Sequence, residues 1–143
     1  MSSNVVTCSA CGTRNRVPGA AKGKPNCQHC KAALPWITAA DDENFDAVAD
    51  SSKVAVLLDL WAPWCGPCRQ VGPVLEKFAL EYAGRLKLVK VNVDNSPIIA
   101  NRFQAQSIPL MLLFKDGQQV GRQLGAQPVP VLKKWLEANL PPA

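Results

Sequence analysis

The fold of this chain is decided by residues 54–68, which read Val54-Ala55-Val56-Leu57-Leu58-Asp59-Leu60-Trp61-Ala62-Pro63-Trp64-Cys65-Gly66-Pro67-Cys68. A near-continuous apolar run that ends at Trp61 is typical of a strand buried on both faces of a sheet. Downstream, apolar residues recur at helical spacing, at Val71, Val74, Leu75, Phe78 and Tyr82. The sequence therefore predicts a strand followed by a helix, with a C-x-x-C pair at their junction.

The position of this pair indicates redox chemistry. Cys65 falls at or just before the first helical turn, where free amides and the helix dipole stabilise a thiolate. Pro67 is tolerated in a first turn, because those amides have no partner within the helix. Cys68 lies one turn further on, on the same face, from which it can attack a mixed disulfide at Cys65. We therefore expect Cys65 to be the exposed nucleophile and Cys68 the more buried resolving thiol.

The other four cysteines form two further pairs with the spacing C-x2-C-x15-C-x2-C, at Cys8, Cys11, Cys27 and Cys30. This spacing is typical of a structural zinc site, in which two knuckles complete a tetrahedron of thiolates. About thirty residues with almost no large apolar side chains cannot bury a core, so this segment needs a metal to fold. His29, inside the second knuckle, is an alternative ligand, although four cysteines already suffice. The sequence predicts one structural Zn²⁺ per chain.

Composition restricts the other possibilities. No apolar run approaches the ~18–20 residues that cross a bilayer, and Met1 to Val6 do not resemble a secretory leader. With three C-x-x-C pairs, this favours metal binding and redox catalysis in a reducing compartment over a disulfide scaffold, and we expect a cytoplasmic protein without membrane attachment.

The net charge of +5 belongs to residues 1–40, which hold five basic residues and no acid. Four thiolates and one Zn²⁺ would lower it to about +3. Aromatic residues suited to stacking on bases are scarce in residues 1–33. A nucleic-acid partner is therefore not expected.

Residues 61–68 strongly resemble the active-site motif of the thioredoxin family, and the similarity runs from about Leu34 to the C-terminus. Asp59 stands where thioredoxins carry a buried acid, and Lys90 matches the lysine near that acid. Ile108–Pro109 matches their cis-proline bond, and Leu110 follows it where a threonine is usual. Further matches are the helix proline at Pro73 and the glycines at Gly121 and Gly125. With the four-cysteine segment in front, the chain resembles the zinc-binding bacterial thioredoxins of the thioredoxin-2 kind.

This resemblance implies an α/β fold, a mixed central sheet with helices on both faces, and a protein-disulfide reductase that works through a Cys65–Cys68 disulfide. It implies that Asp59 transfers a proton for the Cys68 thiol. Without the resemblance, the sequence equally allows Asp59 to be an acid at a strand end whose carboxylate is satisfied by local hydrogen bonds. Lys90 would tune the charge of that acid; the alternative is a solvated lysine on a strand edge without a role in the chemistry. The implied substrate surface consists of Trp64, Gly66, Pro67, Ile108, Pro109 and Gly125. The implied partners are protein disulfides and a flavin- and NADPH-dependent thioredoxin reductase, and the chain is expected to be a monomer.

Local signals predict the elements. We expect strands at 34–37, 54–60, 86–93, 110–115 and 118–124, and helices at 41–49, 66–83, 97–103 and 129–140. Ser96 and Pro97 read as the N-cap and first residue of the third helix. Asp116-Gly117 is typical of a hairpin turn, and Pro141-Pro142 of a helix end.

We divide the chain into a zinc-binding module at 1–33 and a thioredoxin domain at 34–143. All proposed catalytic groups belong to the second part, so the chain without residues 1–33 is expected to remain a folded reductase. Two other functions stay open. The module could be a knuckle that binds a partner, or oxidation of its thiolates could release the metal and expose the apolar surface of a redox-gated chaperone.

Overall fold

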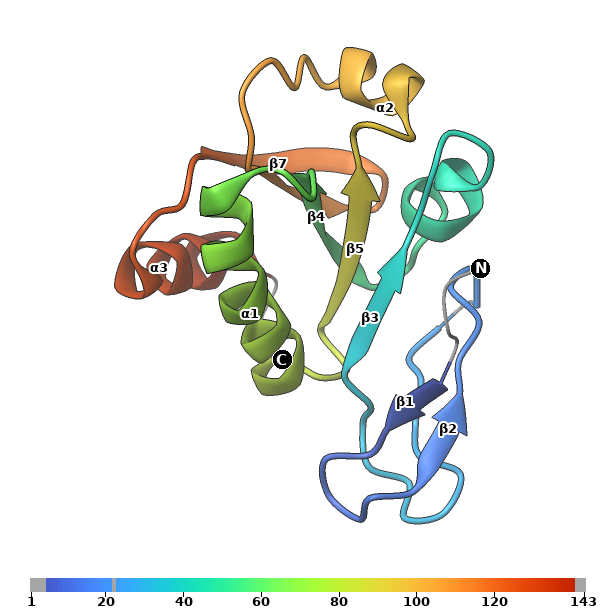
Figure 1. The fold of residues 1–143 in the computed structure, drawn as a ribbon. Coiled ribbons are helices and arrows are strands. Elements are labelled where there is room, and N and C mark those ends of the chain that lie inside the picture. The colour runs from blue at the N-terminus through green and yellow to red at the C-terminus, as the bar shows by residue number, and fades with distance from the viewer. Residues whose placement is uncertain (1–4, 22, 141–143) are drawn as a thin grey trace.

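The computed structural model describes residues 5–21 and 23–140. Its centre is a five-stranded sheet in the order β3-β5-β4-β6-β7 (Figure 1). Strands β3, β5 and β4 run parallel to one another, whereas β6 is antiparallel to β4 and β7 is antiparallel to β6. The expected mixed sheet is thereby confirmed. The strands are β3 (Trp36–Ala39), β4 (Ala55–Trp61), β5 (Leu86–Asn92), β6 (Leu110–Lys115) and β7 (Gln118–Leu124).

Helices cover both faces of the sheet. The short π-helix η1 (Asp46–Asp50) and α2 (Pro97–Arg102) bury apolar side chains, including Val48 and Ile99, on one face. The other face is covered by α1 (Gly66–Glu81) and α3 (Val129–Asn139) (Figure 1). The apolar run of β4 is buried because its alternate residues enter these two cores.

Two elements start at least two residues later than the sequence predicts. Strand β3 begins at Trp36 rather than at residue 34, because the Leu34 N–H donates to the Pro25 carbonyl and Pro35 has no N–H. The segment expected as a helix at 41–49 starts with a turn in which the Asp41 carboxylate accepts from the Glu43 N–H. The following helical turn is a wider π-helical one, in which the Ser51 N–H donates to the Asp46 carbonyl five residues back.

The start of α2 corrects the predicted cap. Ser96 occupies the N-cap position, but its side chain makes no capping hydrogen bond. The Asp42 carboxylate instead accepts from the N–H groups of Ile98 and Ile99, at 3.0 and 2.9 Å. A carboxylate from a distant turn thus satisfies the free amides at this helix start.

The turn between β6 and β7 is as predicted, since Asp116 and Gly117 both have positive φ, at 53° and 76°. Helix α3 ends at Asn139, and Pro141-Pro142 lie outside the described residues.

The N-terminal segment contains a small hairpin that the sequence analysis did not predict. Strand β1 (Val5–Thr7) pairs with β2 (Arg14–Arg16), and the segment lies beyond the start of β3 (Figure 1). Its apolar cluster is shared with the larger domain, and consists of Cys8, Val17, Cys27, Leu34, Trp36 and Val54. The module therefore has no separate core but is packed against the sheet.

Of the helices within residues 5–21 and 23–140, none is long and apolar enough to cross a membrane.

Candidate active site and metal centre

Cys65 and Cys68 lie at the junction of β4 and α1, as predicted, and form a disulfide. Cys65 is the N-cap residue of α1, and its sulfur accepts from the Cys68 N–H at 3.2 Å. The expected contrast in burial is absent, because the exposed fractions are 5% for Cys65 and 4% for Cys68. One covalent bond holds both sulfurs in the same apolar cluster with Ala62.

The Ile108–Pro109 peptide bond is cis, as the resemblance implies. The Ile108 carbonyl oxygen lies 3.8 Å from the Cys65 sulfur. Gly125, at φ +84°, donates its N–H to the Pro109 carbonyl at 2.8 Å. Leu110, which replaces the usual threonine, is fully buried in the core between the sheet, η1 and α2. This departure is therefore a change of core packing.

The surface around the disulfide is apolar and exposed. Trp64 is 67% exposed, and its indole N–H donates to both carboxylate oxygens of Asp94 at 3.2 and 3.1 Å. Gly66 and Pro67 are exposed, and Ile108 is half-buried. Asp94 escaped the sequence analysis because it lies 30 residues from its partner and no local pattern marks it.

Asp59 is a buried acid on β4. It is 1% exposed, and its Oδ1 has no hydrogen-bond partner among the described residues. Burial raises the pKa of Asp59 to about 6, against the opposing charge of Lys90. Lys90 is its register neighbour on β5, half-buried, with Nζ 5.3 Å from the centre of the Trp61 ring. The structure thus places the predicted acid and lysine side by side.

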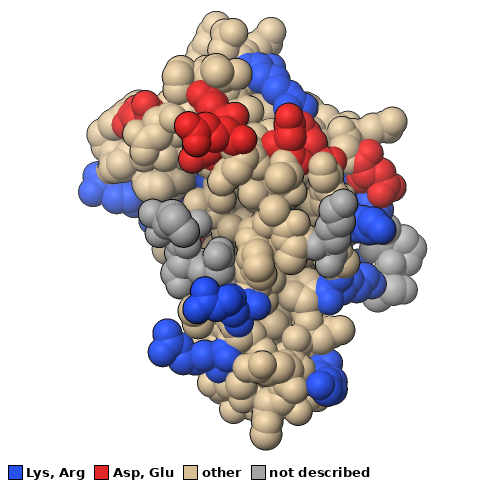
Figure 2. Space-filling model, turned by 90° about the vertical axis from the view of Figure 1, so that its right-hand side faces the viewer, with Lys and Arg blue, Asp and Glu red and all other residues tan. Residues whose placement is uncertain are grey.

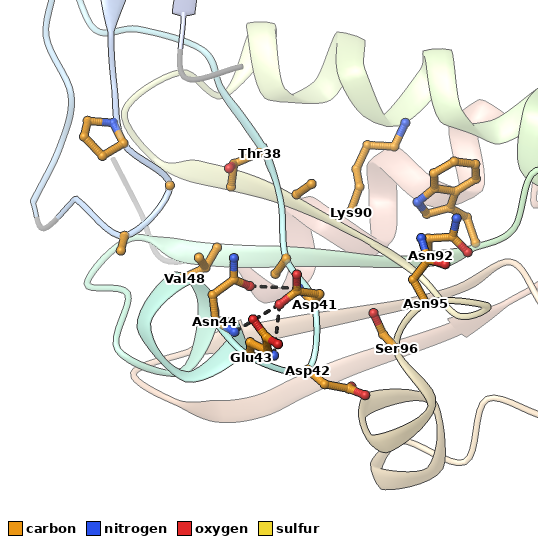
Figure 3. A pocket seen from close by; sticks show the side chains of 16 residues that line it. Thr38, Asp41, Asp42, Glu43, Asn44, Val48, Lys90, Asn92, Asn95 and Ser96 are labelled. Carbon is orange, nitrogen blue, oxygen red and sulfur yellow. Dashed lines mark hydrogen bonds between the residues drawn. The ribbon is translucent and has the colours of Figure 1, made fainter. Parts of the chain in front are cut away.

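A groove of about 850 Å³ runs between the module and the larger domain (Figure 3). One wall is residues 18–20 of the module, and the other includes Thr38 and residues 41–44. Lys90 and Trp61 line it as well. The groove therefore connects the module to the neighbourhood of the buried acid.

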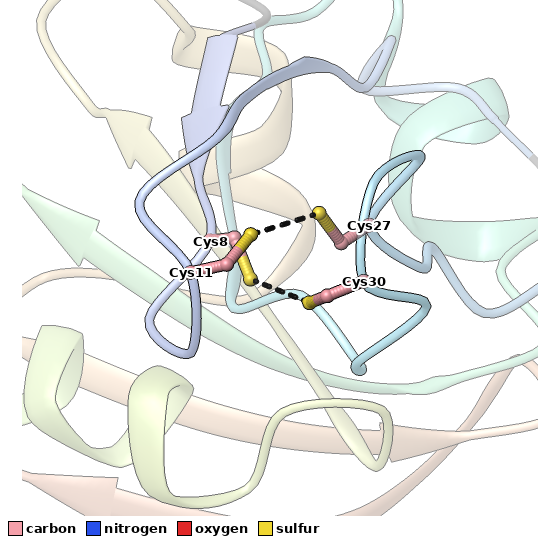
Figure 4. A group of neighbouring side chains, drawn as sticks. All are labelled: Cys8, Cys11, Cys27 and Cys30. Atoms are coloured by element: carbon pink, nitrogen blue, oxygen red, sulfur yellow. Dashed lines mark hydrogen bonds between the residues drawn. The ribbon is translucent and has the colours of Figure 1, made fainter.

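The four remaining cysteines converge on one point (Figure 4). The Cys8 and Cys30 sulfurs are 3.6 Å apart, as are those of Cys11 and Cys27, and all four lie within 4.8 Å of one another. Tetrahedral zinc with bonds of ~2.3 Å requires sulfurs roughly 3.8 Å apart. The thiol set fits such an ion. His29 is exposed and is not part of this group of ligand atoms.

The same backbone turn occurs at both knuckles. The Gly12 N–H donates to the Cys8 carbonyl, and the Lys31 N–H donates to the Cys27 carbonyl. Both donors have positive φ, at 78° and 67°. Each C-x-x-C pair is thereby curled so that its two sulfurs point to one side.

Backbone groups favour thiolate at Cys27 of the second knuckle, whereas the neighbouring thiols and burial raise the pKa of Cys30 to about 11. The N–H of Cys30, and then that of His29 at 3.4 Å, lower the pKa of Cys27 to about 5. The Asn15 side-chain amide also donates to this sulfur, at 3.6 Å. Asn15 is buried and was not expected from the sequence.

Comparison with known proteins agrees with this geometry. The family model described as Thioredoxin matches residues 36–138. Thioredoxin 1 of Nostoc sp. is 46% identical over 99 residues, which are 69% of this chain and 92% of the relative. Thioredoxin of Haemophilus influenzae is 43% identical over 100 residues, 70% of this chain and 94% of the relative. Thioredoxin M5, chloroplastic, of Oryza sativa is 42% identical over 106 residues, 74% of this chain but only 61% of the relative.

A dithiol at the start of a helix, beside a cis-proline on a mixed sheet, defines a thiol-disulfide oxidoreductase. The chain belongs to the thioredoxin family, whose members include protein-disulfide reductases, and it is one of these. The four-cysteine cluster distinguishes it as a variant with a candidate metal centre.

Proposed function

We propose that the protein reduces disulfides of other proteins, with Cys65 as the attacking thiol and Cys68 as the resolving thiol. The observation that carries this proposal is the Cys65–Cys68 disulfide at the N-terminus of α1 beside the cis bond of Pro109. Cys65 is the N-cap residue, so its sulfur lies where the helix dipole and the Cys68 N–H favour a negative charge.

The reaction consumes the reduced pair. The Cys65 thiolate attacks one sulfur of the substrate disulfide, the S–S bond breaks, and the other substrate sulfur leaves as a thiolate that takes a proton. The Cys68 thiol loses its proton and attacks the Cys65 sulfur of the mixed disulfide, which releases the second substrate sulfur. Two electrons have then moved to the substrate, and Cys65 and Cys68 are joined as a disulfide.

The groups around the dithiol support binding of an extended substrate segment. Trp64, Gly66 and Pro67 offer an exposed surface, and the Ile108 backbone beside the Cys65 sulfur is available for strand-like pairing. The Gly125 N–H, in the adjacent loop, donates a hydrogen bond to the Pro109 carbonyl and fixes its position. These residues would position the substrate disulfide over Cys65.

Asp59 is proposed to take the proton of Cys68. Its pKa of about 6 lets it gain and lose a proton near neutral pH, and Lys90 limits how far that pKa rises. The Asp59→Asn variant should therefore reduce protein disulfides more slowly, without the rise of rate with pH around pH 6. A wild-type pH profile in this variant would exclude the role.

Cysteine variants test the order of attack. Cys68→Ser should still attack substrate but not resolve it, so mixed disulfides should accumulate on non-reducing gels. Cys65→Ser should form none. Trapping by Cys65→Ser but not by Cys68→Ser would reverse the two roles.

The electron donor is proposed to be a thioredoxin reductase that uses flavin and NADPH. Purified protein, such a reductase and insulin should together consume NADPH, with Cys65→Ser as the matched control. No NADPH consumption above that control would overturn the assignment.

The four-cysteine cluster is proposed to hold one structural Zn²⁺ through Cys8, Cys11, Cys27 and Cys30. The distances between sulfurs support a closed, structural site, as does the lack of a further ligand atom in this group among the described residues. The ion would cross-link the two knuckles. Metal analysis should find one zinc per chain, lost in Cys8→Ser or Cys27→Ser and kept in Cys65→Ser; loss only in Cys65→Ser would contradict the site.

A reducing compartment, the cytoplasm, is the proposed location, because four free thiols gathered within 4.8 Å stay available to a metal only where they are kept reduced. Fractionation of cells that produce the full chain would test this location.

A further inference from the structure

Lys87 is a buried cation that the redox chemistry does not use. It is the second residue of β5 and is 0% exposed, in a strand whose neighbours Leu86, Leu88 and Val89 are also fully buried. Lysine is almost never fully buried without partners. Its contacts therefore require an explanation.

The Lys87 ammonium joins three segments that are far apart in the sequence. It donates to the carbonyl of Gly19 in the module and to the carbonyl of Val48 in η1. It also lies 4.1 Å from the centre of the Trp36 ring on β3, close enough for a cation–π interaction. Trp36 in turn packs in the cluster that contains Cys8 and Cys27. A single side chain thus bridges the module, η1 and the edge strand.

The approach of the module loop at this point depends on Gly19. A Cβ atom at Gly19 would lie 2.7 Å from Oγ1 of Thr38, which is buried on β3. The glycine allows the loop to come close enough for its carbonyl to reach Lys87. The module loop therefore comes closest to the sheet at the same residue, Gly19, whose carbonyl binds Lys87.

The same contact shapes the groove. Gly19 and Val48 both line it, and Lys87 binds the carbonyl oxygens of both. Trp61 and Lys90 lie along the same groove. The Lys87 contacts therefore lie where the module meets the larger domain along this groove.

We propose that Lys87 is a positioning residue that clamps the four-cysteine module to the thioredoxin domain by binding the Gly19 and Val48 carbonyls over the Trp36 ring. Without its two hydrogen bonds, both carbonyls would lose a buried donor and the module loop would open locally. The clamp is independent of the disulfide chemistry proposed above.

The test is hydrogen–deuterium exchange of the full chain, with Lys87→Met as the variant and Lys77→Met, at an exposed position on α1, as the matched control. Lys87→Met keeps the length of the side chain but removes every donor. We expect segments 14–21 and 44–52 to exchange at least tenfold faster in Lys87→Met, while segments 71–81 and 132–139 change less than twofold. Lys87→Arg, which retains donors and stacking on Trp36, should restore much of the protection.

Two results would overturn the clamp. An unchanged exchange rate at residues 14–21 in Lys87→Met would show that the Lys87 contact does not stabilise the position of the module loop. Faster exchange by a similar factor in all four segments would show that Lys87 supports global stability rather than the position of the module.

A measurement on the wild-type chain covers the case in which Lys87→Met does not fold. In protein labelled with ¹⁵N-lysine, the ammonium protons of Lys87 should exchange with water far more slowly than those of Lys77. Equal exchange rates for the two side chains would contradict the proposal.

Discussion

Asp59 makes the stability of the molecule depend on pH. Its folded-state pKa of about 6 exceeds its ordinary value of 3.8, so the folded chain binds this proton more tightly than the unfolded chain. The stabilisation is complete below pH 3.8 and is lost as pH rises through about 6. A difference of this size corresponds to about 3 kcal/mol.

Asp59→Asn should remove this dependence. Urea denaturation of the oxidised protein at pH 5 and pH 8 should show a smaller decrease of unfolding free energy in the variant than in the wild type, with the variant the more stable at pH 8. An equal decrease in both proteins would show that Asp59 has no shifted pKa.

Two glycines allow the same substitution, Gly to Ala, to be compared at a crowded and at an open position. A Cβ atom at Gly121 would lie 2.8 Å from Nε1 of Trp135, which packs against the core. A Cβ atom at Gly72, buried in α1, would meet nothing within 4 Å. Gly121→Ala should therefore lower the unfolding free energy by ~1–3 kcal/mol, whereas Gly72→Ala should raise it by ~0.5–1 kcal/mol. Denaturation midpoints in the opposite order would refute the contact.

Buried charges show how far single residues can be interpreted from sequence. Asp59 is recognisable in the sequence because it interrupts a run of Val and Leu, and the resemblance to thioredoxins predicts a proton-transfer role for it. Lys87 interrupts a similar run, between Leu86 and Leu88. Its partners lie 68 and 39 residues away, and no local pattern could indicate them.

At the scale of elements, α2 provides a test of capping from a distance. Its first amides are bound by Asp42, while the buried Ser96 Oγ has no hydrogen-bond partner in the part of the chain that the structure describes. Asp42→Ala should lower the unfolding free energy by ~1 kcal/mol. Ser96→Ala should cost less or even stabilise, because it removes an unsatisfied buried hydroxyl.

The two variants are compared by thermal denaturation at one pH. If Ser96→Ala is the more destabilising, the local cap predicted from sequence operates after all.

The elements that were predicted well have strong local signals. The apolar run of β4, the helical spacing of α1 and the Asp116-Gly117 turn each fix their own structure within the chain. Strand β3 and helix η1 were misplaced or had a different geometry, because their starts depend on the Pro25 carbonyl and on the Asp41 side chain. Strands β1 and β2, of three residues each, are too short to show a period.

At the scale of the whole molecule, the boundary at residue 33 divides the chain's chemistry but not its packing. Because all proposed catalytic groups follow residue 33, the chain without residues 1–33 is expected to fold and reduce disulfides. The structure adds that Leu34, Trp36 and Val54 would lose part of their cover, and that Lys87 would lose the Gly19 carbonyl. We therefore expect a folded reductase that is less stable by several kcal/mol, since each large apolar side chain contributes ~1.5–3 kcal/mol on full burial.

Denaturant titration of the full and shortened chains measures this difference, and insulin reduction measures the retained activity. An identical midpoint for both chains would mean that the shared cluster contributes nothing to the stability of the domain.

The charges on the two sides of the groove give the molecule a further physical property. Residues 1–40 hold five basic residues and no acid, and residues 41–50 hold five acids and no base. Figure 2 shows acidic side chains gathered across the upper part of one face, with most of the Lys and Arg side chains of that face beside or below them. With the proposed zinc held by four thiolates, these fifty residues carry about −2 in sum, and their separated charges contribute an electric dipole to a molecule whose net charge is about +3. Above about 0.1 M salt the screening length falls below ~10 Å and the orienting effect of this dipole weakens. Raising the ionic strength should therefore weaken both the preferred angle at which this protein meets a charged partner and the attraction or repulsion set by its net charge.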